Sequence, residues 1–500
     1  MPSSPVRPGA ARVGTSLLSV NETGVRKMLE LHVVPEQLIG DDQWEFVLGM
    51  HFAQIVAILK SQATTIGNVK FIYNAQNPLL DDMVLDLVND GIALFFCPRA
   101  QRLRRIEVYN MDKVVLKFNN TDYFNKRPQV TPTLSHISHV FGPTNPFVIK
   151  SENGRPILVM TFRGLCFIFP VDRTNDPQRQ SEDGLNVVSY AQETAPVLSK
   201  MVVFSGLDLS ANVLARLPLH CYVGNIYAEY VKVLRSGVHT TGLEVCVTYE
   251  PCGREDRGQT PERKVSVLRF GDSTQAIQSA LGSPCKIHFK PDEKIYCLHA
   301  ADPARNSYED RPADYFYNYF TLGLDVVFDA NCHTVKKFIL HTNFPEHYDF
   351  ELYHRCNFEV FLGSNGGSGS ADALDLSSAG ATASDTVSSA GASAAAATTA
   401  SAGAMYAMAD TPDVDPSSSS MVEFSMQQGM LVNSCTKWEE IVAFRGGHRS
   451  FSPIVVIRND STNANNLFGN SCCYCYQNII FDTIRPSGHI ATMTLYPSGS

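Results

Sequence analysis

A six-residue pattern recurs along this chain: glycine, an apolar residue, any residue, two apolar residues and phenylalanine. It occurs at residues 91–96, 164–169 and 323–328, and a degenerate copy without the glycine occurs at 476–481. Glycine tolerates positive φ at the entry to a hairpin. The apolar run is typical of a strand covered on both faces, and the phenylalanine supplies a large side chain for a core. The pattern therefore predicts a buried strand at each position.

Helical spacing of apolar residues accompanies these strands. Residues 50–60, 134–141, 274–281 and 438–444 each place apolar side chains on one helical face. In the first and third copies, Phe96 and Phe328 both stand seven residues before the next strand, at Leu103 and Val335. We therefore predict an α+β fold of repeated modules, each with one helix on a small antiparallel sheet, and an additional β-rich insert.

The predicted organisation divides the chain into seven segments. They are a disordered leader (1–27), a first α+β module (28–130), a second (131–186), a β-rich insert (187–262), a third module (263–362), a disordered Ser/Ala/Gly-rich loop (363–420) and a degenerate C-terminal module (421–500). The leader and the loop lack the apolar residues needed to offset the entropy of ordering.

Charge and cysteine content narrow the class of protein. The net charge is −9, without the basic excess of a nucleic-acid-binding protein, so we expect no nucleic-acid partner. No apolar run is typical of a signal peptide or a transmembrane helix, so we expect a cytoplasmic protein. The 13 cysteines are an odd number, and in a reducing compartment they are expected to be small core residues. Those in predicted strands are Cys97, Cys166, Cys221, Cys246 and Cys297.

No motif for catalysis or cofactor binding is found, so we expect no catalytic residues, no cofactor and no metal. The sequence has no Gly-x-Ser-x-Gly, Walker loop or His-Glu-x-x-His. Asp272 and Ser273 follow a glycine, as in a hydrolase, but their position before a helical face indicates an N-cap.

Two groups of histidine and cysteine leave alternatives open. The residues of the first group are Cys332, His333, His341, His347, His354 and Cys356. Structural or surface roles are favoured there, with a metal site as the alternative, because no Cys-x-x-Cys pair accompanies these residues. In the second group, Cys472, Cys473 and Cys475, core packing is favoured over a redox or metal role.

Arginines flank the first hairpin of the repeated pattern. They are Arg99, Arg102, Arg104 and Arg105. They fit the anionic head group of a phosphoinositide or an acidic partner surface, and the alternative is a solvated rim of the hairpin.

Several longer stretches resemble the phagosome (phagophore) assembly factor family. The stretches are residues 31–36, 43–50, 162–165, 221–229, 271–273, 281–284, 314–323, 328–331 and 340–343. The resemblance extends from about residue 28 to residue 497 and excludes the Ser/Ala-rich tract.

The resemblance implies a non-enzymatic, cytosolic regulator of autophagy. Members of this family act as a scaffold with a WD-repeat β-propeller partner at the site of autophagosome formation, on phosphoinositide-bearing membrane reached through the partner. Direct phosphoinositide binding, or an adaptor role in Golgi and vesicle trafficking with a Golgi location, is the alternative that it leaves open. The family brings no catalytic residues with it.

Overall fold

The computed structural model describes residues 12–18, 28–119, 121–126, 129–142, 148–152, 154–170, 178–182, 185–189, 196–218, 226–249, 262–289, 314–363, 429–445, 452–456, 471–485 and 487–497. Apart from Leu362, Gly363, Gly429 and Met430, the described residues belong to one compact unit, Met1–Phe361 with Leu431–Ser500. The Ser/Ala/Gly-rich segment predicted to be disordered, 363–420, lies outside the described residues apart from Gly363.

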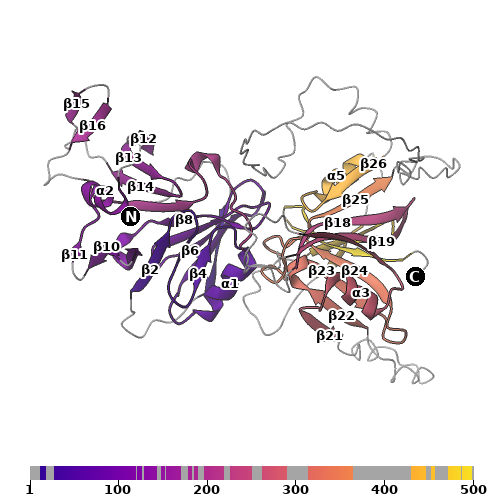
Figure 1. Cartoon of the computed structure of the whole chain (residues 1–500). Helices are drawn as coiled ribbons and strands as arrows, with labels where there is room; N and C mark the ends of the chain where they lie inside the picture. The colour runs from indigo at the N-terminus through magenta and orange to yellow at the C-terminus, as the bar shows by residue number, and fades with distance from the viewer. Residues whose placement is uncertain are drawn as a thin grey trace, which may run out of the picture. The chain divides into compact units, whose positions relative to one another are not determined.

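The first large sheet has nine strands. In spatial order they are β1 (Arg12–Leu18), β5 (Val69–Asn74), β6 (Met83–Leu87), β7 (Ile92–Phe96), β8 (Leu103–Val108), β17 (Lys200–Phe204), β14 (Leu165–Pro170), β13 (Arg155–Phe162) and β12 (Val148–Glu152). Of these strands, Figure 1 labels β6, β8, β12, β13 and β14. A six-stranded sheet follows the order β11 (Gln129–Val130), β10 (Thr121–Lys126), β9 (Val114–Phe118), β2 (Leu29–Val34), β3 (Leu38–Gly40) and β4 (Glu45–Val47). Strands β15 (Gln178–Glu182) and β16 (Leu185–Ser189) form a separate hairpin.

The second large sheet has eight strands. Their order is β21 (Lys286–Phe289), β22 (Tyr315–Tyr319), β23 (Leu324–Phe328), β24 (Val335–His341), β30 (Ile490–Leu495), β29 (Ile479–Ile484), β28 (Ser471–Tyr476) and β27 (Ile454–Val456). A five-stranded sheet contains β20 (Arg263–Arg269), β19 (His239–Tyr249), β18 (Ile226–Ser236), β25 (Phe358–Gly363) and β26 (Gly429–Asn433). The pairs β2 with β9 and β18 with β25 are parallel, whereas neighbours such as β23 with β24 and β29 with β30 are antiparallel.

The described residues contain four α-helices, at the predicted places. They are α1 (Phe52–Ser61), α2 (Leu134–Phe141), α3 (Thr274–Leu281) and α5 (Trp438–Phe444). Short 3-10 turns are η1 (Met111–Lys113), η2 (Leu209–Ala211) and η6 (Phe320–Leu322). The predicted N-cap of α3 is Ser273, whose hydroxyl accepts from the backbone N–H of Ala276.

The prediction of an α+β fold with repeated helix-on-sheet modules is wrong, because the protein is mostly β and its strands lie in large sheets. Strand β8 pairs with β17, and β24 pairs with β30, so strands assigned to separate small sheets share one ladder. The β-rich insert is not separate either, since β17 lies inside the nine-stranded sheet. An open strand edge offers backbone N–H and C=O groups to any other edge, and the side-chain pattern does not encode which edges meet.

One strand lies within the leader that was predicted to be disordered. Residues Arg12–Leu18 form β1 and pair antiparallel with β5. The backbone of β5 supplies hydrogen-bonding partners there, so a segment with little apolar content still forms a strand. The other residues of 1–27 lie outside the described residues.

The repeated strands have the expected backbone at their start and the expected burial at their end. Gly91, Gly164 and Gly323 have φ values of 67°, 76° and 66°. The side chains of Phe96, Phe169, Phe328 and Phe481 are all 0% exposed. In the degenerate copy, the residue equivalent to the glycine is Asn478, which directly precedes β29 and has a φ of 60°. The copy therefore begins two residues later than the position 476 predicted from the sequence.

Gly323 illustrates why these positions need glycine. A Cβ atom there would lie 2.5 Å from the carbonyl oxygen of His354, whereas one at Gly237, with φ 59°, would meet nothing within 4 Å. Alanine at either position has the strain of a left-handed backbone, about 1–2 kcal/mol, and Gly323→Ala adds a clash with backbone. We expect thermal or urea unfolding to show at least about twice the destabilisation for Gly323→Ala as for Gly237→Ala. Equal effects would contradict the close approach.

Candidate functional site

The basic residues of β8 form the candidate site, and a β-bulge explains their placement. Phe95 pairs with Arg105 and Phe96 with Leu103, so Arg104 is an extra residue without a cross-strand partner. Because of the bulge, two consecutive arginines both reach Asp82: Nη1 of Arg104 lies 2.9 Å, and Nη1 of Arg105 3.1 Å, from its carboxylate. The Arg105 guanidinium also lies 4.0 Å from the centre of the Phe95 ring.

The charges on this face of the sheet balance. Arg105 also lies 3.1 Å from Glu107, and Lys200 on β17 lies 3.7 Å from both Glu107 and Glu152. Three basic residues therefore meet three acidic ones, and most of these side chains are largely buried. The pairing reduces the positive potential that an anionic lipid would meet at Arg104 and Arg105.

The other two predicted arginines lie elsewhere. Arg102 is buried, and its guanidinium donates to the carbonyl oxygen of Ala215. Arg99 is exposed, and its carbonyl oxygen accepts from Nη1 of Arg355 at 2.8 Å. The structure therefore brings Arg104 and Arg105 together and separates them from Arg99 and Arg102.

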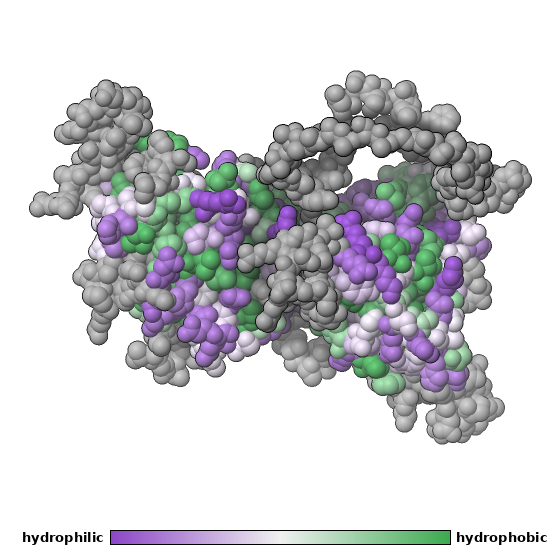
Figure 2. Space-filling view, in the orientation of Figure 1, coloured by the Kyte–Doolittle hydropathy of each residue, from purple (hydrophilic) through white to green (hydrophobic). Residues whose placement is uncertain are grey.

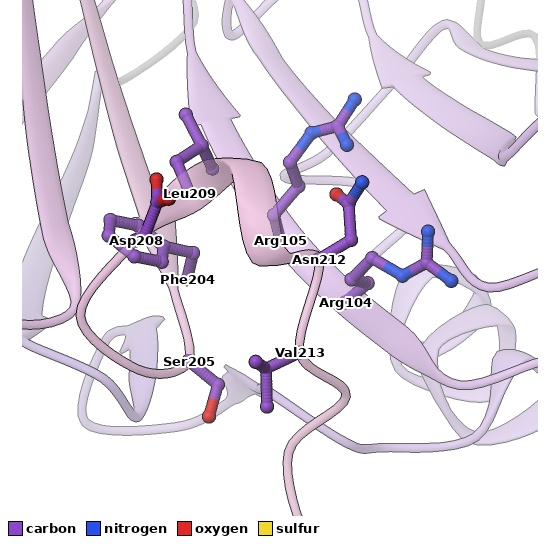
Figure 3. Close-up of a pocket in the computed structure, with 8 residues that line it drawn as sticks. All are labelled: Arg104, Arg105, Phe204, Ser205, Asp208, Leu209, Asn212 and Val213. Atoms are coloured by element: carbon purple, nitrogen blue, oxygen red, sulfur yellow. The ribbon is translucent and has the colours of Figure 1, made fainter. Parts of the chain in front are cut away.

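A shallow hollow, open to solvent, lies between β8 and the segment after β17 (Figure 3). Arg104 and Arg105 line one side, and the segment with the turn η2 lines the other. The lining residues of that segment are Phe204, Ser205, Asp208, Leu209, Asn212 and Val213. Asp208 caps η2, since its carboxylate accepts from the Ser210 N–H at 2.9 Å.

A second basic pair occupies the matching bulge of the eight-stranded sheet, and sequence reasoning missed it. Val327 pairs with Lys337 and Phe328 with Val335, so Lys336 is the extra residue there. Nζ of Lys336 lies 2.9 Å from Asp314, and Nζ of Lys337 lies 4.9 Å from the centre of the Tyr496 ring. The signal was present, because Arg104 and Lys336 both stand eight residues after the phenylalanine of the repeated pattern.

Three of the four histidines of the first group are buried, and the fourth, His333, is exposed, with its Nδ1 3.0 Å from the Tyr315 hydroxyl oxygen. His341, His347 and His354 are buried, and His341 Nε2 lies 3.0 Å from the carboxylate of Asp325. That carboxylate also accepts from the Tyr353 hydroxyl, at 2.8 Å, and from the Asn318 amide, at 2.9 Å. Asp325 occupies the unrestricted position of the repeated pattern, so nothing in the pattern identified it. Within the described residues, no three His, Cys, Asp or Glu side chains are placed to hold a metal ion.

The cysteines are divided between core and surface. The ten in the described residues are free thiols; Cys166, Cys246, Cys356 and Cys472 are buried, as predicted for core residues. Cys473 is half-buried and Cys475 is exposed, so packing does not account for all of the second group. Cys221 and Cys297 lie outside the described residues.

Two buried imidazoles stack beside Arg102. The rings of His51 and His354 lie 3.8 Å apart, and both side chains are almost completely buried. Burial lowers the pKa of His354 to about 4. Burial, and then the proximity of His354 and Arg102, hold the pKa of His51 well below its usual value. The folded protein therefore keeps both rings neutral at neutral pH.

These pKa values predict a loss of stability in acid. An unfolded histidine binds a proton below about pH 6.5, whereas folded His354 does so only near pH 4. Since the unfolded state binds more protons in between, the free energy of unfolding should fall as the pH falls from about 6.5 to about 4, by about 3 kcal/mol for His354 alone. Urea unfolding across this range checks it. His354→Asn should reduce the slope, and exposed His239→Asn should not; equal slopes in both variants would contradict the account.

The fold defines a class of protein: a mostly β protein built from large, predominantly antiparallel sheets. Comparison with known proteins gives the family. The chain belongs to the phagosome assembly factor 1 family, whose model matches residues 42–393 and 407–496, so the predicted resemblance is confirmed. It is 37% identical to a PHAF1 protein of Drosophila melanogaster over 472 residues, 94% of each chain. It is 27% identical to a PHAF1 protein of Arabidopsis thaliana over 463 residues, 91% of this chain and 90% of the relative.

A PHAF1 protein of Caenorhabditis elegans is 31% identical over 333 residues, 66% of this chain and 77% of the relative. No solved structure matches the chain. None of the described helices is both long enough and apolar enough to span a bilayer.

Proposed function

We propose that this chain is a non-enzymatic interaction scaffold in autophagy. The observation that carries the proposal is membership of the phagosome assembly factor 1 family along nearly the whole chain, because an assembly factor works through its surfaces. Two large sheets with apolar side chains on their outer strands offer such surfaces. Hydrophobic and hydrophilic residues are intermixed on the face shown in Figure 2.

The partner proposed is a WD-repeat β-propeller protein, with which the chain reaches the phagophore from the cytoplasm. The membrane contact is assigned to the complex rather than to this chain alone. The pairing of Arg104 and Arg105 with Asp82 supports that assignment, since neither guanidinium is free for a phosphate without breaking an ion pair. Arg99 is the exposed arginine of the predicted set and the candidate for a direct contact.

Co-purification tests the scaffold. The tagged full-length chain, isolated from cells and washed at moderate salt, should retain a WD-repeat propeller protein at a constant ratio. A salt-resistant complex is expected because the charged residues of β8 are already paired within the chain, which leaves apolar contacts to hold the partner. Loss of every propeller protein in the wash would overturn the proposal.

Flotation with phosphoinositide-containing vesicles separates the scaffold from the alternative, a direct phosphoinositide-binding or Golgi and vesicle-trafficking adaptor. The isolated chain should float weakly, and the complex with its partner should float strongly. Arg99→Glu tests the exposed arginine, and Lys150→Glu, on exposed β12, is a matched charge reversal elsewhere. Strong flotation of the isolated chain that Arg99→Glu abolishes and Lys150→Glu preserves would favour the alternative.

A further inference from the structure

Strand β21 is an outer strand of the eight-stranded sheet, and its side chains are exposed. It pairs with β22 on one side, and no other described strand pairs with it. Ile287 and Phe289, two residues apart and so on the same face, are 46% and 66% exposed. An edge with exposed apolar side chains is a template for another strand, and proteins usually protect such edges.

Phe289 ends a row of aromatic rings that begins in the core. Its ring centre lies 5.6 Å from that of Tyr315, which lies 5.4 Å from that of Phe328. Phe328 is fully buried, Tyr315 is 8% exposed and Phe289 is largely exposed. The row therefore crosses three strands and stops at the edge, where a further strand would continue it.

The corresponding edge of the nine-stranded sheet is covered by an added strand. Strand β5 begins the series β5–β6–β7–β8 as β21 begins β21–β22–β23–β24. Phe71 and Ile287 occupy equivalent positions in the two sheets. Across the strands, Phe71 is in register with Leu94, and Ile287 is in register with Val326. Leu94 and Val326 each stand three residues after the glycine of the repeated pattern. At β5, the strand β1 pairs with the edge from Arg12 to Leu18.

Burial at the two edges differs accordingly. Phe71 and Tyr73 are 3% and 6% exposed, with Phe350 stacked against Phe71 at 5.3 Å. The chain thus shows, at one of two matching edges, what covers an edge of this shape: an extended segment paired antiparallel, with apolar cover on the core face.

We propose that β21 binds an extended segment of another protein by strand addition. The segment has apolar side chains at alternate positions, which extend the row from Phe289 and Ile287, and acidic side chains between them. We infer the acidic residues from Lys286. Its side chain is exposed on the face of β21 opposite Ile287 and Phe289, where it would lie beside the added strand and could pair with an acidic side chain. Backbone hydrogen bonds supply affinity in this mode, and the alternate pockets supply specificity. The inference rests on the proposed scaffold role and names one of its contact surfaces.

A defined peptide tests the edge directly. The probe is a fluorescein-labelled peptide in which valine and glutamate alternate, titrated with the full-length chain by fluorescence anisotropy. We expect saturable binding, a loss of about tenfold or more in affinity for Phe289→Asp and for Ile287→Asp, and no change for Leu80→Asp. Leu80 is the matched control, because its side chain is 67% exposed and lies between β5 and β6.

Hydrogen exchange locates the bound peptide and does not depend on how the variants fold. Peptide added to the wild-type chain should slow exchange of the backbone amides of β21. Absence of saturable binding, equal loss in Leu80→Asp, or protection confined to β12 or β27 would overturn the proposal. Protection of β21 without peptide that rises with protein concentration would identify a second copy of the chain as the occupant, and would also overturn it.

The edge site and the scaffold can fail separately. A wild-type chain that retains a propeller partner but shows no protection of β21 by the peptide overturns the edge site alone. A chain that retains no partner overturns the scaffold, whatever the peptide does.

Discussion

Phe328→Ala is expected to lower the free energy of unfolding by about 3–5 kcal/mol, because it removes a fully buried aromatic ring from a strand covered on both faces. The Phe328 ring contacts Tyr315 and Tyr317, with ring centres 5.4 Å and 4.7 Å apart. A cavity at this point would remove the contacts that the Phe328 ring makes with both tyrosine rings. Urea unfolding followed by tyrosine fluorescence or circular dichroism measures the loss.

Phe361→Ala provides the control for this prediction. Its side chain is 53% exposed on β25, where buried and exposed residues alternate, so truncation should change the free energy of unfolding by about 0.5 kcal/mol or less. A Phe328→Ala protein that melts with the wild type would show that the repeated strand does not lie in the core as described.

Local pattern predicted the elements of this fold and failed to predict how they combine. The apolar spacing located α1 and α2, and the glycine–phenylalanine pattern located β7, β14 and β23. These signals arise from contacts within a few residues, and the sequence records them directly. The pairing of β8 with β17 joins residues about 100 positions apart through backbone groups that every residue carries, so no side-chain pattern could indicate it.

The sequence allowed the arginines of the candidate site to be predicted, but not their ion pairs with acidic residues. The sequence shows four arginines near one hairpin, and it also shows Asp82 and Glu107, but nothing in it pairs them. The pairing follows from the bulge at Arg104, a single extra residue that turns two consecutive side chains toward one carboxylate. Arg102, one residue before the strand, is buried beside His51 instead.

Asp325→Ala should produce the other large loss of stability, because it removes the acceptor shared by three buried groups. The carboxylate accepts from the Tyr353 hydroxyl and the Asn318 amide and lies 3.0 Å from Nε2 of His341. Without it, these groups remain buried with no equivalent acceptor at that position, which typically costs about 3–5 kcal/mol. The comparison is Asp314→Ala, which breaks the more exposed ion pair with Lys336 and should cost about 1 kcal/mol or less.

A double-mutant cycle distinguishes the shared network from simple loss of packing. Tyr353→Phe removes one donor to Asp325 and leaves the ring stacked on His341, with the ring centres 3.6 Å apart. If the hydroxyl acts through the carboxylate, its removal should cost much less in the Asp325→Ala background than in the wild type, a coupling of about 1 kcal/mol or more. Additive losses would mean that Asp325 stabilises the strand independently of Tyr353. A positive coupling would show that the unrestricted position of the repeated pattern, in this one copy, anchors the segment that follows β24.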